Sequence, residues 1–217
     1  MSLLHGKKGV VMGVANDHSI AWGISKKLSD EGAELCFTYQ GESLHRRVKP
    51  LADSIKSNFL IECDVLKEGS VKKSFDEIGN HWGEIDFVLH SIAFSEKEEL
   101  KGKYLNTSRN NFSNTMLISC FSFTEVAHEA EKLMKNGGSL LTLTYDGSQK
   151  YIRNYNVMGV AKAALESSVR YLAADLGPSN IRVNALSAGP MKTLAMAGIS
   201  GGKDMMKWSE KNSLMNR

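Results

Sequence analysis

The sequence predicts an α/β fold: one doubly wound parallel sheet flanked by helices. Three observations support this prediction. Short apolar runs alternate with longer segments whose apolar residues recur at every third or fourth position. Such alternation is typical of strands joined by right-handed helical crossovers, which make a sheet parallel. The length of 217 residues suits one sizeable domain. No internal repeat or linker divides the chain, so we expect a single domain over residues 1–217.

The first half of the chain predicts four strands and the helices between them. The expected strands are the apolar runs at residues 9–12, 34–38, 59–62 and 87–90. The expected helices are one that follows the turn at 13–23 and ends near Gly32, one at 43–55 and one at 70–82. In the last helix Val71, Phe75 and Ile78 fall on one face, as expected of a helix that packs against a sheet.

The second half begins with a polar loop and then repeats the alternation. A helix is expected from about residue 109 to 134, a buried strand at 139–144, a long helix at 155–176 and a strand at 181–186. The long helix carries one apolar stripe at spacings of three and four, made of Met158, Ala161, Leu165, Val169, Leu172 and Leu176.

Composition argues against several functional classes. Hydrophobic residues make up 42% and charged residues 24%, as in ordinary soluble proteins, and a net charge of +3 is too small to indicate a nucleic-acid partner. We find no apolar run near the length of a membrane span and no secretory leader, so we expect no membrane association and a cytoplasmic location. Cys36, Cys63 and Cys120 lie singly in apolar runs, which predicts buried free thiols and no metal site.

Tyr155 and Lys162 are the candidate catalytic pair. They are seven positions apart, so two helical turns bring them to the same side of the long helix, at the edge of its apolar stripe. A neighbouring cation is expected to lower the pKa of the phenol and to favour its action on a developing oxyanion. Tyr145, at the end of the strand before this helix, is a second candidate. An interface tyrosine and a solvated lysine are the alternative interpretation of the pair.

The turn after the first strand is a candidate nucleotide site. It runs from Gly13 through Ser19 and Ala21 to Gly23 and combines small residues with a helix start. Small residues let the backbone approach a pyrophosphate, and the helix N-terminus offers free N–H groups. The spacing is neither G-x-G-x-x-G nor a Walker loop. A plain strand-to-helix turn is therefore the alternative.

The next strand ends supply candidate contacts to the rest of a dinucleotide. Gln40 follows the second strand; it can bind a ribose hydroxyl but offers no cation to a 2′-phosphate, which favours NAD over NADP. Arg46 and Arg47, further along, leave NADP open. Asp64 follows the third strand and could accept a hydrogen bond from an adenine amino group, or it is an ordinary turn residue. Small residues at 91–95, after the fourth strand, leave room for a flat ring.

Together these segments resemble a known enzyme family. The motifs are Gly13-x5-Ser19-x-Ala21-x-Gly23, Thr38-Tyr39-Gln40, Cys63-Asp64-Val65, His90-Ser91-Ile92, residues 141–145, residues 154–159, Ala161-Lys162, residues 182–185 and residues 187–190. They resemble the bacterial enoyl-acyl-carrier-protein reductases, the divergent NADH-using branch of the short-chain dehydrogenase/reductase superfamily. The usual superfamily pair is Tyr-x3-Lys, but the residue four before Lys162 is Met158. Tyr155-x6-Lys162 fits the divergent branch instead.

The resemblance implies a Rossmann-like fold and an activity. The expected reaction is NADH-dependent reduction of trans-2-enoyl-acyl-carrier-protein in type II fatty acid synthesis, by a cytoplasmic homotetramer. Tyr155 would donate to the thioester oxygen, Lys162 would hold the nicotinamide ribose and stabilise the anion, and Tyr145 would line the pocket and assist. The implied NADH contacts are Gly13, Ser19, Ile20, Gln40, Asp64, Val65, Ser91, Ile92, Ala93, Lys162, Met191, Thr193, Leu194 and Ala195. The implied substrate contacts are Ser95, Leu100, Tyr145, Tyr155, Met158 and Met205.

The resemblance also has limits and alternatives. Family members usually have about forty more residues, including a last strand, so that strand is expected to be missing from this chain. A substrate lid is expected at about residues 190–210, where glycines and methionines are frequent. For Ile92 and Met191, plain core packing is the alternative to cofactor contact. Two other functions stay open: a short-chain reductase acting on a ketone, and an NAD-binding scaffold without turnover.

Overall fold

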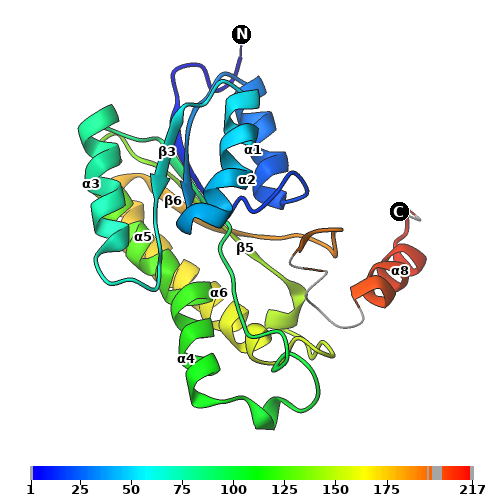
Figure 1. Cartoon of the computed structure of the whole chain (residues 1–217). Helices are drawn as coiled ribbons and strands as arrows, with labels where there is room; N and C mark the ends of the chain where they lie inside the picture. Colours follow the sequence, from blue (N-terminus) through cyan, green and yellow to red (C-terminus); the bar gives the residue numbers. More distant parts are fainter. Residues whose placement is uncertain (1, 195, 197–201, 216–217) are drawn as a thin grey trace.

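The computed structural model describes residues 2–194, 196 and 202–215. Its centre is a six-stranded parallel sheet with the strand order β3-β2-β1-β4-β5-β6 (Figure 1). The strands are β1 (Lys8–Met12), β2 (Glu34–Tyr39), β3 (Phe59–Glu62), β4 (Phe87–His90), β5 (Gly138–Thr144) and β6 (Ile181–Ser187). The predicted parallel sheet is confirmed, and each strand lies within one residue of its predicted bounds.

The helices expected from the sequence are also present, with one difference. They are α1 (Ile20–Asp30), α2 (Gly41–Ser54), α3 (Ser70–Trp82), α4 (Arg109–Met116), α5 (Ser122–Glu131), α6 (Asn156–Leu176) and α8 (Gly202–Asn212). Short 3₁₀ turns are η1 (Tyr104–Asn106), η3 (Asp146–Ser148) and η4 (Gly177–Ser179). The helix expected at 109–134 is divided by the π-helical turn η2 (Leu117–Phe121). Side chains in and beside this turn bind neighbouring segments, and apolar periodicity alone gives no signal for it.

Apolar side chains from α3, α5 and α6 pack against one face of the sheet. Phe75, Phe123 and Leu165 belong to one buried cluster with Val10 and Leu140 of the strands. The stripe predicted on α6 is confirmed, because Met158, Ala161, Leu165 and Leu176 are buried while Val169 and Leu172 pack against this cluster.

The opposite face of the sheet is covered by α1 and α2. Trp22 of α1 and Val48 of α2 pack with Val11, Phe37 and Leu89 of the central strands. Because alternate strand residues point to opposite faces, Val10 and Val11 belong to different clusters. The result is the three-layer arrangement expected for strands that are buried on both sides.

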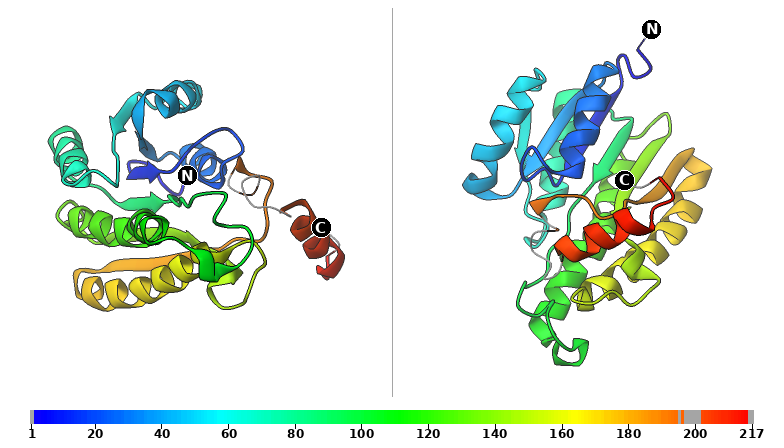
Figure 2. Two further views of the ribbon diagram at one scale, coloured as in Figure 1. Left: turned by 60° about the horizontal axis from the view of Figure 1, so that its bottom comes forward. Right: turned by 90° about the vertical axis from the view of Figure 1, so that its right-hand side faces the viewer.

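Two further features bear on the predictions. Cys36, Cys63 and Cys120 are free and buried, as expected. No helix in the described part of the chain is long and apolar enough to cross a lipid bilayer. The predicted lid lies partly outside the described residues; the described part includes α8, which is set apart from the sheet in Figure 1 and in the left view of Figure 2.

Candidate active site

The predicted cofactor residues follow the carboxyl ends of successive strands and therefore share one edge of the sheet. Strands β2 and β3 are added on one side of β1 and strands β4 to β6 on the other, so the topological switch point lies between β1 and β4, and ligands bind at such a point. Gly13 lies there with a φ of +94°, and a Cβ at this position would be 2.1 Å from the Ser91 carbonyl oxygen. Glycine is thus required by two features of the protein itself, a left-handed φ and close contact with the chain after β4.

Ser19 shapes the turn at the start of α1. Its hydroxyl accepts hydrogen bonds from the backbone N–H groups of Ala15, at 3.0 Å, and Asn16, at 3.1 Å. Although Ser19 is the N-cap residue of α1, its side chain does not cap the first-turn N–H groups. An uncapped helix N-terminus behind a tight turn is a site that fits a pyrophosphate, so the residues present fit a dinucleotide here.

The residues predicted to bind the adenosine half of the cofactor follow β2 and β3 and are exposed or half-buried. Gln40 is exposed at the start of α2, and Arg46 is held by Glu42 through an Nε–Oε1 hydrogen bond of 2.9 Å. The Asp64 carboxylate accepts from the backbone N–H of Leu66 at 3.0 Å, which is the turn role weighed against adenine binding. One carboxylate oxygen can make this bond while the other serves a ligand. Val65 packs partly against the core.

The segment after β4 is fixed by side chains from α4 and η2. The Ser119 hydroxyl bonds both the backbone N–H of Phe94, at 3.0 Å, and its carbonyl, at 3.1 Å. The Ser95 hydroxyl donates to Oδ1 of Asn111. Ala93 is exposed, whereas Ile92 is half-buried and packs against the core, so core packing accounts for part of its surface.

The segment after β6 carries the last predicted cofactor residues. Met191 is 49% exposed, so the alternative of plain core packing for this residue was wrong. Leu194 is also exposed, and the Thr193 hydroxyl accepts from the backbone N–H of Met196 at 3.1 Å. Ala195 and the side chain of Met205 lie outside the described residues.

The catalytic candidates Tyr155 and Lys162 are both buried, with exposed fractions of 7% and 6%. Tyr155 is the N-cap residue of α6, and Lys162 lies two turns along it. Lys162 Nζ donates to the backbone carbonyl of Leu143 on β5 at 2.8 Å. The alternative of a solvated surface lysine is therefore wrong, and the two side chains share the buried face of α6 as predicted.

The expected electrostatic effect of the lysine on the phenol was wrong. Burial raises the pKa of Tyr155, and the neighbouring Tyr145 adds to that rise. Burial also lowers the pKa of Lys162 to about 8, because an ammonium with few polar partners loses solvation. Desolvation thus outweighs any stabilisation of a phenolate, and Tyr155 is a protonated hydrogen-bond donor at neutral pH.

Four of the predicted substrate residues form one apolar cluster. Leu100, Tyr155 and Met158 are buried together, and Tyr145 packs against them. The rings of Tyr145 and Tyr155 meet edge to face, with centroids 5.3 Å apart and planes at 70°. An apolar wall with two phenols suits a hydrophobic substrate whose one polar group must be recognised.

Sequence reasoning missed a buried network behind this wall. His90, fully buried at the end of β4, lies 2.9 Å through Nε2 from the Ser122 hydroxyl and 3.3 Å through Nδ1 from the Thr142 hydroxyl. Since Ser122 Oγ donates to the Ile118 carbonyl, it accepts from Nε2–H, which leaves Nδ1 as an acceptor. Burial, and next the charge of Lys162, lower the pKa of His90 to about 3, so the ring is neutral. The sequence signal for His90 was its place in the motif His90-Ser91-Ile92, on which the family resemblance partly rests.

The sequence also gave little warning of the backbone around Tyr155. Asn154 has a φ of +60° and Asn156 a φ of +36°, so two left-handed residues flank the tyrosine. Asn156 Nδ2 donates to the Glu99 carbonyl at 3.1 Å, which ties the start of α6 to the loop after β4. Asparagine tolerates this conformation better than most residues, and the Asn-Tyr-Asn pattern was the only signal.

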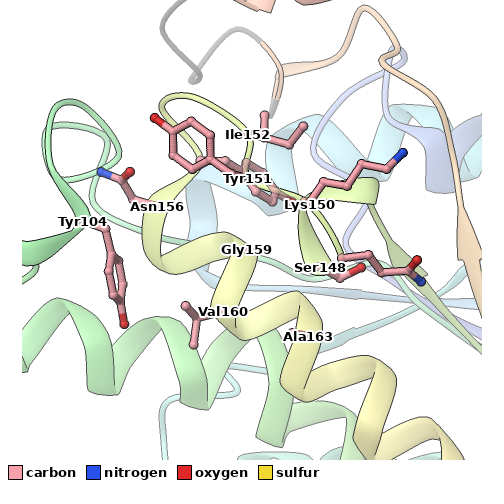
Figure 3. Close-up of a pocket in the computed structure, with 12 residues that line it drawn as sticks. Tyr104, Ser148, Lys150, Tyr151, Ile152, Asn156, Gly159, Val160 and Ala163 are labelled. Atoms are coloured by element: carbon pink, nitrogen blue, oxygen red, sulfur yellow. The ribbon is translucent and has the colours of Figure 1, made fainter.

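A cavity of about 370 Å³ lies beside the first turns of α6 (Figure 3). Asn156, Gly159, Val160 and Ala163 of α6 line it, together with the loop from Gly147 to Ile152. At 100° per residue Val160 lies about 160° around the helix from Lys162, whereas Gly159 lies only about 60° from it, so the cavity extends from the side of the catalytic pair to the opposite face. None of the predicted cofactor residues in the described part of the chain lines this cavity, but the catalytic candidate Tyr155 forms part of its wall.

The fold and the arranged side chains agree with comparisons to known proteins. The family model described as "Enoyl-(Acyl carrier protein) reductase" matches residues 13–217. "Enoyl-[acyl-carrier-protein] reductase [NADH] 2" of Rhizobium meliloti is 62% identical over 215 residues, which cover 99% of this chain and 80% of that protein. The crystal structure of FabI from Candidatus Liberibacter asiaticus aligns with a TM-score of 0.97 at 56% identity, covering 100% of this chain and 84% of that one. The reductase of Anaplasma phagocytophilum, solved in complex with NAD, aligns with a TM-score of 0.95 at 53% identity, covering 99% and 82%.

Proposed function

Because the chain belongs to the enoyl-[acyl-carrier-protein] reductase family, we propose that its described site reduces the carbon–carbon double bond of an enoyl thioester carried by acyl carrier protein. The function is that of an NADH-dependent enoyl reductase of fatty acid synthesis, with NADH as its cofactor. The observation that carries the proposal is the buried pair Tyr155 and Lys162, placed on one face of α6 at the sheet's ligand-binding edge. A tyrosine and lysine at this spacing distinguish the family from reductases that use Tyr-x3-Lys.

Tyr155 acts on the substrate in this proposal. NADH, when bound, supplies the hydride to C3 of the enoyl group, and negative charge then develops on the thioester oxygen. The phenol of Tyr155 is protonated because burial raises its pKa, so it can donate a hydrogen bond or a proton to that oxygen. Tyr145 packs edge to face on Tyr155 and lines the same wall, which supports a substrate-facing role for both rings.

Lys162 is assigned to the cofactor ribose and to the anion. Its ammonium already donates to the Leu143 carbonyl, which holds the long side chain at the end of β5. Two further N–H donors of the ammonium are then available for ribose hydroxyls. Because the pKa of Lys162 is lowered to about 8, the group is charged at neutral pH but close to losing its proton.

The remaining predicted residues divide between cofactor and substrate. Gly13, Ser19 and Ile20 would hold the pyrophosphate at the N-terminus of α1, and the ends of β2, β3 and β4 would hold the adenosine and nicotinamide. The apolar cluster of Leu100 and Met158 would receive the acyl chain. Residues 190–210 are proposed to form the lid over it, although residues 195 and 197–201 lie outside the described part of the chain.

We also propose a homotetramer in the cytoplasm. Phe112, Leu117 and Phe121 leave 38–53% of their surface exposed along α4 and η2, and on α6 Val160 is 38% and Tyr171 73% exposed. Large apolar side chains gathered on two helices support burial between subunits. Three buried free thiols fit a reducing compartment. Molar mass from light scattering would test the assembly, and a monomer would contradict it.

Turnover is tested by following NADH absorbance with a crotonyl thioester as the substrate. Oxidation of NADH that depends on this substrate supports the proposal. A β-ketoacyl thioester in the same assay separates the ketone-reducing alternative, and the proposal expects little rate with it. Binding of NADH without turnover of either thioester would favour a non-catalytic scaffold and would contradict the proposal.

A further inference from the structure

Two glycines beside the ring of Tyr155, Gly147 and Gly159, lie where a Cβ would meet neighbouring atoms at less than 3 Å. A Cβ on Gly147 would be 2.5 Å from Cδ1 and 2.8 Å from Cε1 of that ring. A Cβ on Gly159 would be 2.8 Å from the Gly147 carbonyl oxygen and 3.6 Å from the same ring. The first three separations are too short for a real Cβ, whereas 3.6 Å is an ordinary contact distance. The loop therefore packs directly on the ring because Gly147 lacks a side chain, and on α6 because Gly159 lacks one. In Figure 3 Gly159 is on the α6 turn that faces this loop.

The loop that carries Gly147 is itself held to α6. Glu166 accepts hydrogen bonds from the hydroxyls of Thr144, at 2.6 Å, and Ser148, at 2.5 Å. Burial opposes ionisation of Glu166, but these bonds outweigh it and lower the pKa of the carboxyl, which is therefore ionised at neutral pH. Thr144 lies three positions before Gly147 in the sequence, and Ser148 follows it directly. The ionised Glu166 carboxylate therefore holds the loop, and Gly147 with it, against the ring through charge-assisted hydrogen bonds.

Other neighbours limit the ring from different directions. Tyr145 meets it edge to face, and the backbone on either side of Tyr155 is fixed in left-handed conformations at Asn154 and Asn156. The Tyr155 side chain is thereby confined by contacts on its ring as well as by its own backbone. A displacement of about 1 Å at a reacting group can cost about a hundredfold in rate, so this confinement has a catalytic consequence.

We propose that Gly147 and Gly159 are positioning residues that set the place of the Tyr155 hydroxyl, and that Glu166 holds the loop in contact. The inference rests on the proposed role of Tyr155 in enoyl reduction. None of the three acts on the substrate directly. The loop of residues 144–149 limits the position of the ring on the side away from the substrate. Because the two glycines lack side chains, the ring can lie in direct contact with this loop.

The first test is Gly147→Ala in the full-length protein. The added methyl displaces the ring or the loop, so kcat should fall about tenfold to a hundredfold while the Kd for NADH stays unchanged. Gly177→Ala is the matched control, because Gly177 lies at the far end of α6 with a φ of −54° and nothing within 4 Å of its Cβ position. The control should keep the wild-type kcat. Wild-type kcat in Gly147→Ala would overturn the inference.

A double-mutant cycle with Tyr155→Phe separates positioning from general damage. If Gly147 acts through the Tyr155 hydroxyl, Gly147→Ala should lower kcat much less in the Tyr155→Phe background than in the wild type. Independent, multiplying losses would overturn the inference. If Gly147→Ala does not fold, the cycle is run with Glu166→Gln, which keeps the side-chain shape and removes the charge. A severalfold loss of kcat in Glu166→Gln that is absent or much smaller in the Tyr155→Phe background supports the inference. An equal fold-loss in both backgrounds, or no loss in either, overturns it.

The same cycle distinguishes failure of the inference from failure of the proposed function. A wild-type rate in Tyr155→Phe alone would overturn the catalytic role of that hydroxyl, and the positioning inference would fall with it. A slow Tyr155→Phe enzyme with multiplying losses overturns the positioning inference and leaves the proposed function intact.

Discussion

Two sides of the site are organised in opposite ways. The catalytic wall, formed by Tyr145, Tyr155 and Lys162 at the end of β5 and the start of α6, is largely buried and is held by contacts distant in sequence. The cofactor rim, formed by the turns after β1 to β4, is mostly half-buried or exposed. Its hydrogen bonds after β1 are local, such as those from Ala15 and Asn16 to Ser19, whereas the segment after β4 is held by distant residues, Ser119 and Asn111.

The difference follows from what each side must do. A hydroxyl that acts on a developing oxyanion needs one fixed position, which tertiary packing supplies. A rim that receives a large ligand needs exposed backbone groups already in place, which tight local turns supply. Substitutions on the wall should therefore change turnover strongly, whereas substitutions on the rim should change cofactor affinity by smaller amounts.

The largest expected effects separate the two members of the catalytic pair. Tyr155→Phe should lower kcat by about a hundredfold, the usual worth of a transition-state donor, and leave the Kd for NADH nearly unchanged. Lys162→Ala should lower kcat and weaken NADH binding as well. Steady-state kinetics and NADH fluorescence titration measure both quantities. Equal loss of NADH affinity in the two variants would contradict the division of roles.

The wall also predicts a pH dependence, because the pKa of Lys162 is lowered to about 8. The active ammonium is lost as pH rises through this value, so kcat/KM should fall above about pH 8. Lys162→Arg, whose charge persists, should not show this fall. A profile for the wild type that stays flat to pH 10 would show that the lysine does not titrate there.

Stability should change in the opposite direction over the same range. Between about pH 8 and the ordinary lysine value of 10.5, the unfolded chain binds the proton that folded Lys162 has released. The unfolded state then carries more protons, so this group makes the free energy of unfolding rise with pH. Denaturant unfolding of wild type and Lys162→Met at both ends of the range measures the difference, and an equal pH slope in the two proteins would refute it.

A smaller effect is expected at the rim, where Gln40 sets the cofactor preference. Gln40 itself offers no cation to a 2′-phosphate and Arg46 is hydrogen-bonded to Glu42, so kcat/KM should favour NADH over NADPH by roughly tenfold, about one charge-assisted hydrogen bond. Gln40→Arg should shift the ratio toward NADPH. A wild-type preference for NADPH, abolished by Arg46→Gln or Arg47→Gln, would show that those arginines read the phosphate.

The smallest expected effect is that of Ser19→Ala. This change removes the acceptor for two backbone N–H groups of the turn but leaves the start of α1 in place. The loss of a neutral, solvent-accessible hydrogen bond is worth about 1 kcal/mol, so the Kd for NADH should rise only about fivefold, with kcat unchanged. A fall in kcat comparable to that of Tyr155→Phe would erase the proposed contrast between rim and wall.

The same contrast explains what the sequence could predict. Strands and most helices were predictable because apolar residues recur with the spacing at which side chains are buried, as for Leu165 on α6 and Val10 on β1. The pairing of Tyr155 with Lys162 was predictable from helical spacing. The pKa of Tyr155 was predicted in the wrong direction, because desolvation depends on packing from distant segments. The roles of Gly147 and Glu166 depend on contacts between the loop and α6, and no local pattern announces such contacts.

The π-helical turn η2 has a consequence for insertions and deletions. Relative to an uninterrupted α-helix, it accommodates one surplus residue, which advances the helix beyond it by about 100°. Loss of one residue from Leu117–Phe121 would restore a regular helix, but it would rotate Ser122 against Asn111 on the other side of the turn. Asn111 could then hold the loop at Ser95, or Ser122 could hold His90, but not both. Here a shortened chain can still form a continuous helix while its active site loses alignment.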